Sequence, residues 1–230
     1  ITLVEKESSR DFYRSKMLGA LYEETGQVKK ALKAYQEALA KKSSDIETRL
    51  KVVQLLQIQG ELEAAIKQYE ELIRAAPRNP DFVFQLAEAL IQRGDRKAAL
   101  EHLKKLEDRS KGDEETLAAL VDFYERVEER KRAMEVLQRL ARDPRDPRHL
   151  VELGDRYYQD GDKEKAVRTW KRIMSLIPNK ARALFTLGEV YLEHDMPKEA
   201  LESLAEAVKL APKLTNYKKS YALALERTGA

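Results

Sequence analysis

The side chains in this sequence most able to do chemistry are its three histidines, because imidazole binds metals and moves protons near neutral pH. None of His102, His149 and His194 has a second metal ligand four residues further on, as a zinc-binding helix requires. The chain contains no cysteine, which excludes thiolate metal sites, thiol nucleophiles and disulfides. Every glycine is isolated, and neither a phosphate-binding loop nor a Gly-x-Ser-x-Gly motif is present. We therefore predict no catalytic residue, no metal site and no cofactor.

Acidic pairs such as Glu23-Glu24 and Glu70-Glu71 could in principle serve acid–base chemistry in a cleft. In a chain with 40 acidic residues, we interpret them instead as solvated helix surface. The single tryptophan, Trp170, falls in a column of large apolar residues, so we interpret it as core and not as a stacking platform. We expect the chain not to be an enzyme, since catalysis here would need an appended domain.

The composition is that of a folded chain with a nearly balanced charge. Of its 230 residues, 43% are hydrophobic and 36% charged, and 43 basic against 40 acidic residues give a net charge of +3. So small a surplus gives no reason to expect nucleic acid as a partner. The longest run without a charge, Val52 to Gly60, is too short for a membrane span, which needs about 20 apolar residues. We expect a soluble protein, with the cytoplasm favoured as its location.

Helix breakers are few, with nine glycines and seven prolines, and the remaining composition favours helix nearly throughout. Several residue types recur at an interval of 34 residues, with one interval of 33, which is typical of a repeat array. Each period predicts two helices, joined by a turn at a glycine that tolerates left-handed backbone and ended by a proline. The recurring alanines are Ala31, Ala65, Ala99, Ala133, Ala166 and Ala200, and the large apolar residues four positions later are Tyr35, Tyr69, Leu103, Leu137, Trp170 and Leu204.

Two periods show the complete pattern of a large residue, Leu, Gly, Tyr, Ala, a second large residue, a small or apolar residue and Pro. These are Leu150, Leu153, Gly154, Tyr157, Ala166, Trp170, Ile173 and Pro178, followed by Leu184, Leu187, Gly188, Tyr191, Ala200, Leu204, Ala207 and Pro212.

This pattern resembles the tetratricopeptide repeat (TPR) family over residues 12 to 230. The resemblance implies an all-α fold, a right-handed α-α superhelix of six helix-turn-helix repeats plus a C-terminal capping helix. We place the repeats at 12–45, 46–79, 80–113, 114–146, 147–180 and 181–214, and the capping helix at 215–230. Extending the register backwards puts Ile1 and Val4 in the columns of Tyr35 and Ala38. We therefore interpret residues 1–11 as the tail of a preceding repeat's second helix, cut from a longer array.

The pattern is weakest in repeat four. The small column formed by Gly19, Gly154 and Gly188 becomes valine at Val121, as it also does in repeat two, and Glu128 replaces the turn glycine. The repeat is also one residue short. We expect its helix pair to open and the array to be irregular near residues 111–147. Ordinary repeat degeneracy and a hinge or docking surface are the two interpretations of this irregularity.

The resemblance also implies that the first helices line the concave groove of the superhelix. Thirty groove positions contain eleven acidic and four basic residues, so the rest of the chain is basic, with clusters on the second helices such as Arg130-Lys131-Arg132. Aromatic and aliphatic anchors beside fixed charge are typical of peptide-binding surfaces. The predicted partner-binding groove contains Leu50, Phe84, Glu88, Ile91, Asp122, Val151, Asp155, Tyr158, Phe185, Glu189 and Leu192.

Four of these groove residues, Glu88, Asp122, Asp155 and Glu189, form a ladder of mid-helix acids at one-repeat intervals. Asp122 has Arg126 four residues on, a plausible local ion pair. The other three have no base at three or four residues' distance, which leaves two alternatives, contacts to a partner and salt bridges between neighbouring repeats.

The function that follows is a protein–protein interaction scaffold or adaptor whose groove binds a basic, amphipathic segment of a partner protein. Two alternatives are recognition of an acidic partner or anionic surface by the basic convex face, and a scaffold for bacterial export or polysaccharide assembly. TPR co-chaperones hold the acidic C-terminal tail of heat-shock chaperones with a clamp of Lys, Asn, Asn, Lys and Arg. The matching positions here are Lys16, Ala20, Lys51, Asp81 and Gln85, so we do not expect that ligand.

Overall fold

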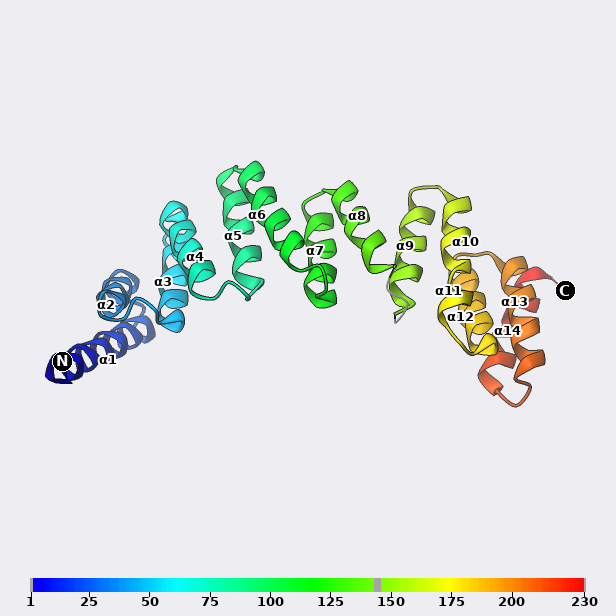
Figure 1. Cartoon of the computed structure of the whole chain (residues 1–230), viewed down its shortest axis with the longest axis horizontal. Helices are drawn as coiled ribbons and strands as arrows, with labels where there is room; N and C mark the ends of the chain where they lie inside the picture. The colour runs from blue at the N-terminus through cyan, green and yellow to red at the C-terminus, as the bar shows by residue number, and fades with distance from the viewer. Residues whose placement is uncertain (1, 143–145, 230) are drawn as a thin grey trace. The chain divides into compact units, whose positions relative to one another are not determined.

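The computed structural model describes residues 2–142 and 146–229, with side chains described from residue 9 onward. Throughout that part of the chain the regular structure is helical, and the all-α repeat fold is confirmed. The chain divides into two compact units, an N-terminal unit of residues 1–112 and a C-terminal unit of residues 113–230. Each unit is a series of helix pairs (Figure 1).

The N-terminal unit contains three antiparallel pairs, formed by helices close to 14 residues long except for the longer α1. Val52 and Leu55 of the second pair pack with Leu32 and Tyr35 of the first pair in one buried cluster, which joins the two repeats. The helices are α1 (Thr2–Glu24), α2 (Val28–Lys41), α3 (Ile46–Ile58), α4 (Leu62–Ala75), α5 (Asp81–Arg93) and α6 (Arg96–Arg109).

The C-terminal unit repeats this arrangement and ends in a helix without a second partner. The second helix of repeat five is interrupted at Arg172, whose guanidinium donates a hydrogen bond to the carbonyl of Ala141 (3.2 Å) in repeat four. The helices are α7 (Glu114–Arg126), α8 (Arg130–Leu140), α9 (Arg148–Gln159), α10 (Lys163–Lys171), α11 (Ile173–Leu176), α12 (Lys180–Glu193), α13 (Pro197–Leu210) and α14 (Thr215–Thr228).

Each first helix ends in a residue with left-handed backbone, even where the glycine of the pattern is replaced. Glu128 has φ of 61° and Asp195 has φ of 53°, close to the 69° of Gly26. The amide of Glu129 then donates to the carbonyl of Tyr124 (2.7 Å), which satisfies an orphan carbonyl at the helix end. Repeat four therefore keeps the turn that its sequence appeared to lose.

The small column lets the two helices of a pair approach closely. A Cβ atom at Gly19 would lie 2.6 Å from the ring of Tyr35, and one at Gly154 would overlap the ring of Trp170. Where the column holds valine, at Val53 and Val121, the side chain is also buried. The helix pair of repeat four, α7 and α8, thus still packs around Val121, and the break in the pattern does not expose its core.

The N-terminal segment differs from the expectation of a separate preceding helix. Helix α1 runs from Thr2 to Glu24 without a break, so residues 2–11 continue directly into the first helix of repeat one. The physical reason lies in the sequence, because no glycine or proline occurs before Gly19 to end a helix near residue 12. The structure of Ile1 lies outside the described residues. An origin in a longer array stays a prediction.

The close approach at Gly154 predicts that Gly154→Ala lowers the free energy of unfolding by about 1–3 kcal/mol, because the added methyl overpacks the site of Trp170. Trp170 is the single tryptophan, so its fluorescence during urea unfolding measures this site directly. Gly112→Ala is the matched control, since nothing lies within 4 Å of a Cβ there. Equal stability of the two variants would contradict the packing described.

The left-handed conformation of Glu128 predicts that Glu128→Gly stabilises the C-terminal unit by about 1 kcal/mol, because glycine adopts that backbone without steric cost. Glu135→Gly, in the interior of α8, should destabilise it by a similar amount. Thermal unfolding followed by circular dichroism compares the two. A loss of stability in Glu128→Gly would show that the carboxylate, not the backbone, matters at this turn.

Candidate functional site

The predicted groove residues lie on one face of the first helices, α1, α3 and α5 in the N-terminal unit and α7, α9 and α12 in the C-terminal unit; we call it the first-helix face. In the N-terminal unit, ion pairs join neighbouring first helices along this face. Lys16 of α1 reaches Glu47 of α3 (2.6 Å) and Asp45 (3.4 Å), and Lys51 of α3 reaches Glu23 of α1 (2.8 Å). Salt bridges between repeats thus occupy several of the acids counted in the groove.

The same kind of bridge joins the first helices of repeats four and five. Arg156 of α9 donates to Glu125 of α7 (2.7 Å), and both side chains are about two-thirds buried. Burial raises the pKa of Glu125 above its usual value, although Arg156 opposes the shift. These residues therefore hold repeats four and five together instead of facing a partner freely.

Asp155 of the acid ladder is engaged with the core and with the next repeat. The indole Nε1 of Trp170 donates to the Asp155 carboxylate (3.1 Å) and to the carbonyl of Val151 (3.1 Å). The Nε2 atom of His194 lies 3.3 Å from the same carboxylate. Half-burial raises the pKa of Asp155 above its usual value, with the histidine acting in the opposite direction. For this acid, the alternative of an inter-repeat contact holds.

Tyr158 and His194 complete an aromatic cluster around Trp170. The hydroxyl of Tyr158 donates to the carbonyl of His194 (2.9 Å), and its ring centroid lies 4.8 Å from that of His194 and 5.8 Å from that of Trp170. The role of His194 was missed by the sequence analysis, which placed it in no recurring column. Its offset of 39 residues from Asp155 is longer than one repeat, so periodicity gives no signal for this contact.

Two acids of the ladder remain without an ion pair to any residue that the structure describes. Asp122 on α7 is exposed, and Glu189 on α12 is half-buried. The suggested pair between Asp122 and Arg126 does not form, and the Arg126 guanidinium lies 4.7 Å from the ring centroid of Phe123 instead. Glu88, on α5, is half-buried and already interacts with neighbouring groups. The ladder is therefore uneven in its freedom to bind.

The apolar groove residues are shared between the surface and the repeat interfaces. Leu50, Phe84, Ile91, Val151 and Phe185 are half-buried, whereas Leu192 is buried. The ring of Phe185 stacks on Tyr217 of α14 with centroids 4.2 Å apart, so its outer edge is what a ligand could reach. Leu192 contributes to packing and not to an open surface.

A cavity of about 610 Å³ lies in the C-terminal unit where the sequence is irregular. The short helix α8 and the bridge between Arg156 and Glu125 border it. Acidic and basic side chains line it in similar number, which gives no preference for a charged ligand. Its lining consists of Glu125, Arg130, Lys131, Met134, Glu135, Leu137, Arg156, Gln159 and Asp160.

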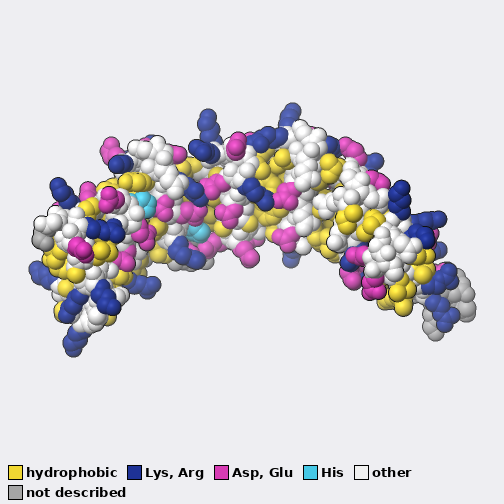
Figure 2. Space-filling model, turned by 180° about the vertical axis from the view of Figure 1, so that it is seen from behind, with side chains coloured by type: hydrophobic (Ala, Val, Ile, Leu, Met, Phe, Trp, Pro, Cys, Tyr) yellow, Lys and Arg dark blue, Asp and Glu magenta, His cyan; other side chains and the backbone are white. Residues whose placement is uncertain are grey.

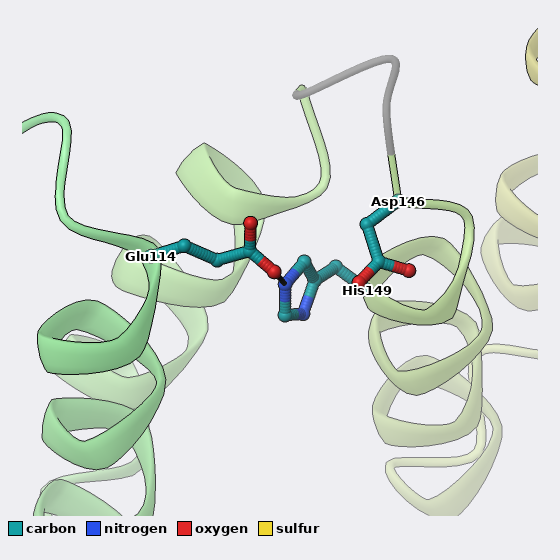
Figure 3. A group of neighbouring side chains, drawn as sticks. All are labelled: Glu114, Asp146 and His149. Atoms are coloured by element: carbon teal, nitrogen blue, oxygen red, sulfur yellow. Dashed lines mark hydrogen bonds and ion pairs between the residues drawn. The ribbon is translucent and has the colours of Figure 1, made fainter.

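One group of described side chains has metal-ligand types within reach of one another: Glu114, Asp146 and His149 (Figure 3). His149 Nε2 lies 3.1 Å from Glu114 and joins α7 to α9. Both oxygens of Asp146 accept from Arg148, whose Nε lies 2.8 Å away, and the backbone amide of Arg148 donates to Asp146 as well (2.9 Å). A cation would have to displace this guanidinium, so we interpret the group as an ion-pair network at the start of α9.

The surface charge is mixed on the face that Figure 2 shows, where Lys and Arg side chains are interspersed with Asp and Glu. None of the described helices is long and apolar enough to cross a membrane.

Comparison with known proteins identifies the repeat. A tetratricopeptide repeat family model matches residues 5–145, more than half of the chain, and a second matches residues 181–214. A tetratricopeptide repeat protein from Parabacteroides merdae is 17% identical with a TM-score of 0.41, over 93% of this chain and 84% of that one. YrrB, described as a TPR protein with an unusual peptide-binding site, is 19% identical with a TM-score of 0.36, over 100% and 97%. A thermophilic TPR protein from Thermus thermophilus is 23% identical with a TM-score of 0.33, over 93% and 98%. No curated protein matches the chain in sequence.

The bidentate contact with Arg148 lowers the pKa of Asp146 to about 2, and its side chain is 13% exposed. A carboxyl whose folded pKa is depressed stabilises the fold above its unfolded pKa, and this contribution disappears as the pH falls through the folded pKa. We therefore expect wild-type stability to fall between about pH 4 and pH 2, and Asp146→Asn to lose part of this dependence. Thermal unfolding over this pH range measures it. Asp122→Asn, at an exposed acid, is the control, and an identical effect of both changes would contradict the assignment.

Proposed function

Because this chain belongs to the tetratricopeptide repeat family, whose members act as protein–protein interaction scaffolds, we propose that it is a non-enzymatic adaptor for a basic, amphipathic protein segment. The binding surface is the first-helix face of the C-terminal unit, with Asp122 and Glu189 as its acidic contacts. Val151, Tyr158 and Phe185 offer apolar edges to the partner.

The observation that carries this proposal is the free state of Asp122 and Glu189. Asp155, Glu23 and Glu125 already accept hydrogen bonds within the protein, so a basic ligand would have to break those bonds. Asp122 and Glu189 have no ion pair with a described residue and can meet a lysine or arginine without that cost. They also occupy the same column of repeats four and six, which makes them a spaced pair for an extended or helical segment.

The bases of the second helices are less available than their number suggests. Lys104 pairs with Glu107 (3.0 Å) and Asp108 (3.3 Å), and Lys165 pairs with Asp162 (2.6 Å). Such local pairs neutralise the basic clusters where they arise. This supports the first-helix face over the alternative of an acidic partner on the second helices.

A selection of random displayed peptides on the full chain tests the proposal without knowledge of the partner. We expect the selected peptides to combine Lys or Arg with apolar residues. Their affinity should fall about tenfold or more in the double variant Asp122→Lys/Glu189→Lys, because like charges then face each other.

The matched control is Glu164→Lys/Glu202→Lys, which changes the net charge equally at two exposed positions on the second helices α10 and α13. It should bind the selected peptides as the wild type does. Peptides that are acidic, or that bind both double variants alike, would place the binding surface elsewhere.

A further inference from the structure

Helix α1 exposes a row of large apolar side chains. Tyr13, Met17 and Leu21 follow one another at intervals of four residues and are 61%, 66% and 55% exposed, and Leu18 beside them is 37% exposed. Large apolar side chains that are this accessible and contiguous along one helix are typical of an interaction surface. Figure 2 also shows hydrophobic side chains at the surface beside the N-terminal end of the chain.

The later repeats show what this face of a first helix normally does. The positions that correspond to Leu18 in repeats two to six are all buried, and so are those that correspond to Leu21 in repeats two, three, four and six and in α14. In repeat two these positions are Val52 and Leu55, which pack on the preceding repeat. The exposed face of α1 is therefore the repeat-to-repeat interface continued, without a partner. The residues compared are Val52, Leu86, Leu120, Leu153 and Leu187, then Leu55, Ala89, Phe123, Val190 and Ala224.

The charges at the two ends of this row are complementary to each other. Arg10 lies seven residues before Met17 and Glu24 lies seven residues after it, on the same side of the helix. Both are exposed, and neither forms an ion pair with another described side chain. Two antiparallel copies of the helix that meet at Met17 would place Arg10 of each beside Glu24 of the other, and Tyr13 beside Leu21.

We propose that α1 is a homodimer interface, in which two copies of this chain pack their α1 helices antiparallel about Met17. The contact is isologous, with an apolar centre and an Arg10–Glu24 ion pair at each end. This inference is independent of the proposed function, because the surface lies on a different unit from the acidic peptide-binding face.

The charges favour this arrangement over head-to-tail association of the two ends of the chain. The C-terminal end also exposes apolar residues, Leu210, Leu214 and Leu223. Lys218, Lys219 and Arg227 stand among them, and they would meet the basic half of α1 with like charge. A head-to-tail contact would also lead to open chains instead of a closed dimer.

The first test measures the mass of the full chain by light scattering and sedimentation over a range of concentrations. The wild type should be a dimer at the higher concentrations, and Met17→Glu should be a monomer with unchanged helical circular dichroism, because Met17 is exposed. Ile58→Glu, at a residue 63% exposed in the same unit, is the matched control and should remain dimeric. A wild type that is monomeric at every concentration, or a control that dissociates equally, would overturn the proposal.

The second test uses the charges to separate a second copy from any other occupant. Arg10→Glu and Glu24→Arg should each weaken self-association about tenfold, since both ion pairs of the dimer become repulsive. An equimolar mixture of the two variants should form a heterodimer, because both pairs are then attractive again, and the double variant should dimerise like the wild type. Failure of the mixture to associate would overturn the antiparallel geometry. Oligomers that survive Met17→Glu and are lost in Leu223→Glu would assign a head-to-tail contact instead.

Discussion

The structure depends on the close packing of a large side chain of each second helix against a small residue of its first helix. Tyr35 lies on Gly19, Trp170 on Gly154 and Leu204 on Gly188, each closer than a Cβ atom would allow. Because this contact sets the distance within the pair, it also sets which side chains reach across to the next repeat. Trp170 illustrates the consequence, since the indole that fills the core also donates a hydrogen bond to Asp155 on the first-helix face. The surface that we assign to binding is thus positioned by the core beneath it.

Charge on that face is used mainly within the protein. Lys16, Lys51 and Arg156 each bridge two first helices and neutralise acids that the sequence counts toward an acidic groove. Exposed ion pairs of this kind contribute only about 0–1 kcal/mol each to stability. Their larger effect is to decide which acids remain available, and the remaining ones are few enough to make a binding surface specific.

An array of repeats buries the same face of each unit except at its ends. The N-terminal end of this chain makes that rule visible, because Leu18 and Leu21 are exposed in columns that are otherwise buried. The C-terminal end is treated differently. Tyr217 of α14 stacks on Phe185, and Arg227 donates a hydrogen bond to the carbonyl of Leu192 (2.8 Å), so the last helix closes the preceding repeat with both apolar and polar contacts.

The sequence by itself determined the helical repeat, its period and its core, because glycine, alanine and large apolar residues recur at fixed spacing and each spacing has a local physical cause. It also anticipated that Trp170 is core. The turn at Glu128 kept its shape because the backbone hydrogen bonds of a helix end can impose left-handed geometry on a residue that does not prefer it. The continuous helix α1 could have been foreseen from the lack of any breaker before Gly19. The partners of the groove acids were decided by tertiary structure alone. A contact such as that of Asp155 with His194 joins residues of different repeats at an irregular separation, and periodicity carries no information about which long side chains meet across the interface.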